Sequence, residues 1–164
     1  DEMGQTLTAM QTELSLADAD TGASLHDRLA LLGGESLVAA LELVRGAPLA
    51  DAAPGQWHWA EELRTDISSA LRDVGLVLTD RALAVGDLDL ARWAAARALV
   101  VAPEDEQLLC ARIRTEYRGG NQAEVERLVN HVARQARLLG VDLLPETVVL
   151  CQQVIEGRLR AQRA

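Results

Sequence analysis

The sequence predicts an all-α fold, and three observations lead to that prediction. Leu and Ala together fill 55 of the 164 positions, a composition that favours helix. The only aromatic residues are Trp57, Trp59, Trp93 and Tyr117, whereas an all-β sandwich draws on aromatic and β-branched side chains. Apolar residues recur at steps of three and four along much of the chain. A chain of this length fits one domain with a sizeable core.

The charge argues against two classes of partner. All 16 basic residues are Arg, and the net charge is -9. Sequence-independent nucleic-acid binders and binders of anionic membranes both need a positive field. The acidic start does not resemble a secretory signal, and no stretch approaches the roughly 20 apolar residues of a membrane span. We expect a cytoplasmic domain, excised from a longer protein because it begins at Asp1, and that parent could even be membrane-anchored.

The first elements form a helical hairpin. Residues 1–24 are predicted to be a polar N-terminal segment, and residues 25–164 the helical domain. Within that domain, one helix covers residues 25–32 and a second covers residues 35–45, joined by a pair of Gly residues and closed by Gly46.

A loop and a long helix follow. Residues 47–56 contain two Pro and a Gly, which remove backbone donors and favour turns. The next helix carries an apolar stripe from Leu63 to Val85 and ends at Gly86. Gly75 weakens this helix but need not break it.

The segment from Leu88 to Ala102 is the most regular in the chain. Small side chains at steps of three and four form a narrow face that allows a neighbouring helix to approach closely. Leu90, Trp93 and Val101 form a second apolar face. We therefore expect this helix to lie between two neighbours.

Three further helices complete the domain. Pro103 is expected to begin one that ends at a Gly pair, with Leu109, Ile113 and Tyr117 facing inward. Asn121 can cap the next helix, which ends at Gly140 and whose core face includes Leu139. Pro145 opens the last helix, and its apolar residues are Val148, Val149, Cys151, Ile155 and Leu159.

The spacing of two turns indicates a repeat. Gly86 and Gly120 are 34 residues apart, which is the tetratricopeptide period, and each lies at a turn between two helices. Ala91, Ala98 and Pro103 occupy the small-residue and Pro positions of that pattern. The predicted architecture is therefore a tetratricopeptide-like stack of antiparallel helical hairpins in a right-handed superhelix.

An ordered set of strings resembles the bacterial transcriptional activator domain over roughly residues 25–160. The strings are ALELVRGAPL at 40–49, WAE at 59–61 before Arg64, AVGD at 84–87, ALVVAPEDE at 98–106 and LLGVDLLPET at 138–147. The resemblance implies a tetratricopeptide-like module of actinobacterial regulators of the antibiotic-regulatory type, found also in LysM-containing membrane proteins. Those regulators carry a winged-helix domain first, and residues 1–24 are too short and acidic to contain one. The resemblance implies the interaction or effector half of a regulator, which would contact DNA only through a domain absent here.

Tryptophan residues are the first candidates for a partner-binding surface. Trp57 and Trp59 flank a His, and Trp93 lies on the regular helix. Each indole either anchors local structure or forms an exposed hot spot for a protein partner. A partner would dock into the concave face of the stack.

Arginine residues are the second candidates. Arg127, His131 and Arg134 share one helix face, which is either a solvated exterior or a site for phosphate or an acidic partner. Residues 108–164 carry a net charge of +3, against -12 for residues 1–107. Weak nucleic-acid contact through this Arg-rich third is one alternative function. A homodimer formed through terminal helices is another.

No pattern points to catalysis. His26, His58 and His131 are on separate elements, so we expect no metal site, even with Cys110 or Cys151 included. The two cysteines are interpreted as small buried hydrophobes, with a disulfide as the alternative. Neither a phosphate-binding Gly loop nor a nucleophile motif is visible. We therefore expect a non-enzymatic module without a cofactor.

Overall fold

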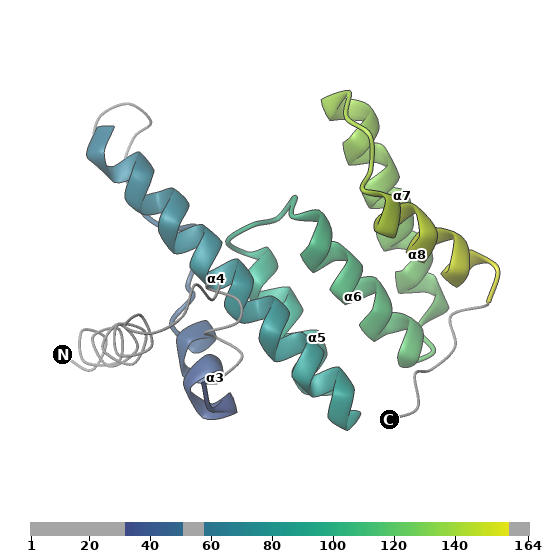
Figure 1. The fold of residues 1–164 in the computed structure, drawn as a ribbon, viewed down its shortest axis with the longest axis horizontal. Helices are drawn as coiled ribbons and strands as arrows, with labels where there is room; N and C mark the ends of the chain where they lie inside the picture. Colours follow the sequence, from purple (N-terminus) through teal and green to yellow (C-terminus); the bar gives the residue numbers. More distant parts are fainter. Residues whose placement is uncertain (1–31, 51–57, 158–164) are drawn as a thin grey trace, which may run out of the picture.

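The computed structural model describes residues 32–50 and 58–157, with only the backbone described for residues 58 and 59. These residues form helices and no strand, so the all-α prediction is confirmed for them (Figure 1). The helices are α3 (Gly34–Glu42), α4 (His58–Val85), α5 (Leu88–Leu99), α6 (Glu106–Arg118), α7 (Gln122–Leu139) and α8 (Pro145–Ile155). The helix predicted over residues 25–32 lies almost wholly outside the described residues.

The helices are arranged in two layers. Each helix packs against the next one in the chain, and α6 also contacts both α4 and α8. Helices α4, α6 and α8 therefore lie in one row, while α5 and α7 cover its other side (Figure 1). Helix α3 packs on α4 and α5 at the N-terminal end of the row.

Most helix ends follow the predicted signals. Helix α4 ends just before Gly86, which has a positive φ of 79° that a residue with a Cβ rarely adopts. Asn121 caps α7 by accepting a hydrogen bond from the backbone N–H of Glu124, and Gly140 ends that helix. Pro145 occupies the first turn of α8, as expected.

Two predicted helix ends were wrong. Helix α6 begins at Glu106 and not at Pro103, because the carboxylate of Asp105 accepts a hydrogen bond from the backbone N–H of Leu108 at 2.9 Å and acts as the N-cap. Helix α3 ends at Glu42, before the expected stop at Gly46.

The N-terminal part of α4 is tied to the preceding loop through Arg64. Its guanidinium donates to the backbone carbonyls of Pro48 and Leu49 at 3.2 and 3.1 Å. It also pairs with the carboxylate of Glu61, 2.6 Å away and one helical turn earlier. These contacts give a structural reason for a Glu and an Arg at these positions.

Helices α4 and α5 approach each other closely at Gly75. A Cβ placed on Gly75 would overlap the Cβ of Ala98, so the absence of a side chain at Gly75 lets the two helices meet. The predicted small face of α5 is confirmed, since Ala91, Ala95 and Ala98 are fully buried. Helix α5 lies between α4 and α6, as expected for a helix with two apolar faces.

Two large groups of buried side chains form the core. The first joins α3, α4, α5 and the start of α6, and includes Leu37, Leu41, Leu78 and Leu108. The second joins α6, α7 and α8. Its buried members are Leu109, Cys110, Ile113, Val125, Leu128, Val132, Leu150 and Val154.

The core positions predicted at helix ends were partly wrong. Leu139, expected to face the core, is 59 % exposed, and Leu63 and Val85 at the two ends of the α4 stripe are also exposed. A helix can follow an apolar period beyond the point where its neighbour stops covering it.

Helix α8 also buries a different face from the one expected. Thr147, Leu150 and Val154 point inward, while Val148, Val149 and Ile155 are exposed. Helix α8 lies at the end of the row, so the described chain places no further helix over its second apolar face. Leu159 lies outside the described residues.

No helix in the described part of the chain is both long and apolar enough to span a bilayer.

Candidate functional site

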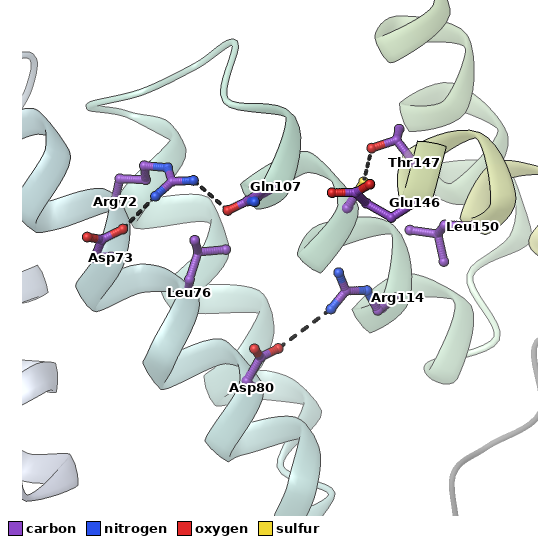
Figure 2. Close-up of a pocket in the computed structure, with 10 residues that line it drawn as sticks. Arg72, Asp73, Leu76, Asp80, Gln107, Arg114, Glu146, Thr147 and Leu150 are labelled. Atoms are coloured by element: carbon purple, nitrogen blue, oxygen red, sulfur yellow. Dashed lines mark hydrogen bonds and ion pairs between the residues drawn. The ribbon is translucent and has the colours of Figure 1, made fainter. Parts of the chain in front are cut away.

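A pocket of about 460 Å³ opens where α4, α6 and α8 lie in a row (Figure 2). This volume lies within the range of about 300–1,000 Å³ that is typical of ligand sites. We call it the α4–α6–α8 pocket. Its lining residues are Arg72, Asp73, Leu76 and Asp80 on α4, Gln107, Cys110 and Arg114 on α6, and Glu146, Thr147 and Leu150 on α8.

Helical spacing brings these side chains to one surface. On α4, Leu76 and Asp80 are four residues apart, and on α6, Gln107, Cys110 and Arg114 are three and four apart. Residues at these steps share one side of a helix. Three helices therefore each present one polar stripe to the same pocket.

The charge of Arg72 is already neutralised within the protein. Its guanidinium donates to the carboxylate of Asp73 at 2.5 Å and to the side chain of Gln107 (Figure 2). It also donates to the carboxylate of Asp105 at 2.6 Å. Partial burial opposes the charge, but the hydrogen bond and charge of Asp105, followed by those of Asp73, raise the pKa of Arg72 overall. Arg72 therefore joins α4 to the start of α6.

The second cation of the pocket is held much more loosely. Arg114 lies 3.7 Å from the carboxylate of Asp80, and the two side chains are 42 % and 57 % exposed. Exposed pairs of this kind contribute only about 0–1 kcal/mol. Glu146, on the α8 side, makes no ion pair with the part of the chain that the structure describes. The pocket therefore presents carboxylates that a ligand can reach.

The floor of the pocket is apolar and contains an unreactive thiol. Leu76 and Leu150 are buried there, and Sγ of Cys110 lies 3.3 Å from the hydroxyl of Thr147. Burial raises the pKa of Cys110, which outweighs the opposing hydrogen bond to Thr147. A thiol in this state is a poor nucleophile. Cys151 on α8 is half-buried, and neither cysteine forms a disulfide.

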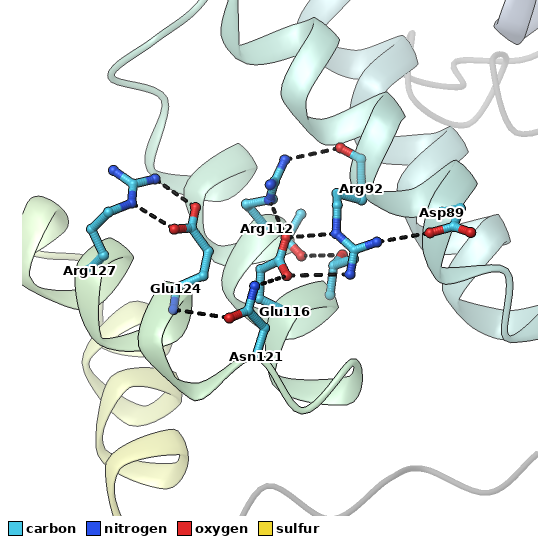
Figure 3. Close-up of polar contacts among 9 residues, drawn as sticks. Asp89, Arg92, Arg112, Glu116, Asn121, Glu124 and Arg127 are labelled. Carbon is cyan, nitrogen blue, oxygen red and sulfur yellow. Dashed lines mark hydrogen bonds and ion pairs between the residues drawn. The ribbon is translucent and has the colours of Figure 1, made fainter.

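The opposite side of α6 carries a second polar cluster, which is built around a buried carboxylate (Figure 3). We call it the Glu116 cluster. Arg92 on α5 donates to both oxygens of the Glu116 carboxylate, at 3.0 and 3.4 Å, and Asn121 donates to one of them at 3.2 Å. Nε of Arg112 lies 2.8 Å from the same carboxylate, and its guanidinium also donates to the backbone carbonyl of Arg92 at 3.1 Å.

The Glu116 cluster stabilises the charged form of its carboxylate. Burial opposes ionisation of Glu116, but hydrogen bonds from Arg92 and Asn121 and the charges of Arg112 and Arg92 outweigh it and lower its pKa. Only 1 % of the Glu116 side chain is exposed. The cluster therefore connects α5, α6 and the start of α7, and its carboxylate is already engaged by side chains of the protein.

Of the Trp residues predicted from the sequence, Trp93 is the one whose side chain the structure describes, and it does not line the pocket. Trp93 on α5 is half-buried against the first core, with the guanidinium of Arg97 5.9 Å from the centre of its ring. Trp57 lies outside the described residues, and Trp59 is placed only as a backbone position of α4. This contact with the core agrees with the first of the two alternatives for Trp93, in which the indole anchors local structure.

The predicted Arg face lies on α7, in the other layer. Arg127 is exposed but donates twice to the carboxylate of Glu124 at 2.7 Å, and this hydrogen bond raises the pKa of Arg127. His131 is half-buried and Arg134 is exposed. Helix α7 contributes none of the lining residues of the pocket.

The apolar periodicity of the helices did not predict the pocket residues, because these residues lie beside the apolar stripes and not in them. Arg72 and Asp80 flank the buried stripe of α4, and Arg114 follows the buried Ile113. A polar stripe next to an apolar one is typical of any exposed helix face. A usable signal would have been the recurrence of such stripes on alternate helices of a repeat.

The described residues contain no group of three or more His, Cys, Asp or Glu that could hold a metal ion. His26 lies outside these residues, and His58 is described only in its backbone.

Comparisons of the chain with protein-family models, with curated proteins and with solved structures found no match. The chemistry of the α4–α6–α8 pocket is therefore the basis for assigning a function.

Proposed function

We propose that this chain is a non-enzymatic protein-interaction module whose α4–α6–α8 pocket receives a segment of a protein partner or of a neighbouring domain. The observation that supports this most strongly is the pocket itself, which is open, partly apolar and lined by three helices. Its polar groups are spread along the row, an arrangement suited to contacting an extended or helical segment at several points.

The proposed architecture is a tetratricopeptide-like stack with α4, α6 and α8 on the inner, concave side. In such arrays alternate helices line a concave binding surface. The two layers support the proposal, as does the 34-residue spacing of Gly86 and Gly120, which both have positive φ values at turns between helices. The pocket would then be the concave face.

The proposed context is a bacterial transcriptional regulator. The resemblance to the bacterial transcriptional activator domain supports this context, and it implies DNA binding through a domain outside this chain. The proposed role of the chain is to couple partner binding to that domain in an actinobacterial, cytoplasmic protein. The same module could serve at the cytoplasmic end of a membrane-anchored parent.

The chemistry of the pocket supports binding over catalysis. Arg72 is engaged by two carboxylates, and the thiol of Cys110 is kept neutral by burial. Catalytic sites instead hold a nucleophile or base activated by a neighbouring group. Neither Asp80 nor Glu146 is paired with a residue of the described chain in a way that would activate it.

Site-specific photo-cross-linking in cells tests the proposal. A benzophenone amino acid would replace Gln107 in the pocket, Arg134 on the exposed face of α7 or Trp93 on α5. We expect cross-links to a protein, or to another domain of the parent chain, from position 107. Cross-links from position 134 or 93 alone would place the partner on the surface predicted from the sequence. No cross-link from position 107 would contradict the proposed function.

A second candidate function is self-association, and one observation favours it. Apolar side chains are exposed around the end of α7 and the outer face of α8. They are Leu138, Leu139, Val141, Leu144, Val148, Val149 and Ile155. Contiguous exposed apolar surface is a feature of protein interfaces, and identical patches can pair across a two-fold axis.

Sedimentation velocity at increasing concentration tests self-association. The prediction is a dimer that Val149→Glu converts to a monomer, while Gln152→Glu, which adds the same charge on α8, leaves it intact. A wild-type chain that stays monomeric at high concentration would exclude this function.

A further inference from the structure

We infer that the α4–α6–α8 pocket selects a basic segment, with an apolar side chain on the pocket floor and Arg or Lys beside it. This inference rests on the proposed function and specifies the chemistry of the partner. It follows from the imbalance between paired and unpaired charges around the pocket.

The charges that line the pocket are three carboxylates and two guanidinium groups. Arg72 is shared between Asp73 and Asp105, so neither Arg72 nor Asp73 is free to engage a ligand. The groups left are Asp80, Arg114 and Glu146. Two of these three are acidic, and Glu146 has no ion-pair partner within the described residues.

The weak pair of Asp80 and Arg114 offers an exchangeable position. Its atoms are 3.7 Å apart and both side chains are about half-exposed to solvent, so a ligand cation can take the place of Arg114 at little cost. Asp80 lies on α4 and Glu146 on α8, on opposite sides of α6 (Figure 2). A segment that crosses the pocket would meet one carboxylate on each side.

An acidic partner would meet the opposite situation. It would have Arg114 alone to contact and would approach Asp73, Asp80 and Glu146. The whole chain also carries a net charge of -9, which attracts cations and repels anions at long range. Charge complementarity therefore favours a basic segment.

The floor adds an apolar requirement. Leu76, Cys110 and Leu150 line the pocket together with the two acidic residues. A volume of about 460 Å³ accepts an aliphatic side chain together with its flanking groups. An apolar residue of the partner would bury its surface there, and its basic neighbours would reach Asp80 and Glu146.

Fluorescence anisotropy with three labelled heptapeptides tests the inference. Each peptide has a central Leu, flanked on each side by three Arg, three Gln or three Glu. With the 164-residue chain at low salt, we expect the Arg peptide to bind about tenfold or more tightly than the Gln peptide, and the Glu peptide most weakly. Added salt should reduce the preference for Arg, because it screens the exposed carboxylates.

Two variants separate the pocket from the general negative charge of the chain. Asp80→Asn combined with Glu146→Gln should bring the Arg peptide to about the affinity of the Gln peptide. Glu62→Gln combined with Glu126→Gln removes the same charge from exposed positions that do not line the pocket, and should leave the preference intact.

Equal affinities of the Arg and Gln peptides, equal effects of the two double variants, or no binding of any peptide would each overturn the inference. The cross-linking experiment at position 107 decides the proposed function independently. If a neutral or acidic segment cross-links at position 107, the pocket is still a binding site, but its preference for basic partners is contradicted.

Discussion

Arg and carboxylate side chains pair on both sides of α6, but the two sides differ in how buried and how close these pairs are. Arg112 faces the Glu116 cluster, where its side chain is 17 % exposed and lies 2.8 Å from a buried carboxylate. Arg114, two residues later, faces the α4–α6–α8 pocket and lies 3.7 Å from an exposed one. On one side the carboxylate is buried and shared among several side chains, and on the other it is exposed and loosely paired.

This difference separates a structural cluster from a candidate binding site. In the Glu116 cluster the carboxylate receives hydrogen bonds from Arg92 and Asn121 and is out of reach of solvent. A buried charge is tolerated only when it is paired in this way. In the pocket, the carboxylates of Asp80 and Glu146 are exposed to solvent, so a ligand can still bind them.

Glu116→Gln should give the largest effect on stability. It leaves Arg92 and Arg112 without their buried counter-charge, and removing one partner of such a pair costs about 3–5 kcal/mol in the free energy of unfolding. Urea denaturation followed by circular dichroism would measure this loss. The matched variant Glu146→Gln should change stability by less than about 0.5 kcal/mol. Similar losses for both variants would remove the distinction between the two sides of α6.

Gly75→Ala should have the next largest effect, because it tests the tightly packed contact beside the pocket. The new Cβ would overlap Ala98, and overpacking of this kind costs about 1–3 kcal/mol, although Ala favours helix more than Gly does. Combining it with Ala98→Gly should restore part of the loss. Thermal unfolding of the single and double variants checks this, and a single variant as stable as the wild type would contradict the close contact.

Acid should weaken the Glu116 cluster selectively. Because the folded chain lowers the pKa of Glu116, its contribution to stability is present above the unfolded value near 4.5 and is lost as the pH falls through the lower folded value. The stability difference between the wild type and Glu116→Gln should therefore shrink below about pH 4.5. Urea denaturation across this pH range measures it. A difference that stays constant down to pH 3 would contradict the lowered pKa.

Asp80→Asn should have the smallest effect on folding. It breaks only the exposed pair with Arg114, which contributes about 0–1 kcal/mol. Binding of the Arg peptide should nevertheless weaken several-fold. A variant that loses stability without losing affinity would show that Asp80 supports the fold and does not contact a ligand.

The sequence predicted the fold better than the site because the two depend on different information. Helical periodicity and end residues such as Gly86, Asn121 and Gly140 act locally, so the positions of α4, α5 and α7 were predicted well. Gly75 was predicted to be tolerated, but its contact with Ala98 depends on how two helices cross.

The candidate site depends on residues that only the fold brings together. Asp80, Arg114 and Glu146 are separated by more than thirty positions each along the chain, and each resembles an ordinary exposed charge on its own helix. The residues that were conspicuous in the sequence lie away from this pocket or outside the described side chains. Trp93 packs on the core, and Arg127 is engaged by Glu124.

Amide chemical-shift mapping with the Arg-containing heptapeptide reports on both sides of α6 at once and so distinguishes the pocket from the Glu116 cluster. We expect shifts at Gln107, Cys110 and Arg114, with smaller or no shifts at Arg112 and Glu116. Shifts confined to the Glu116 cluster or to α7, with none at the α4–α6–α8 pocket, would contradict it.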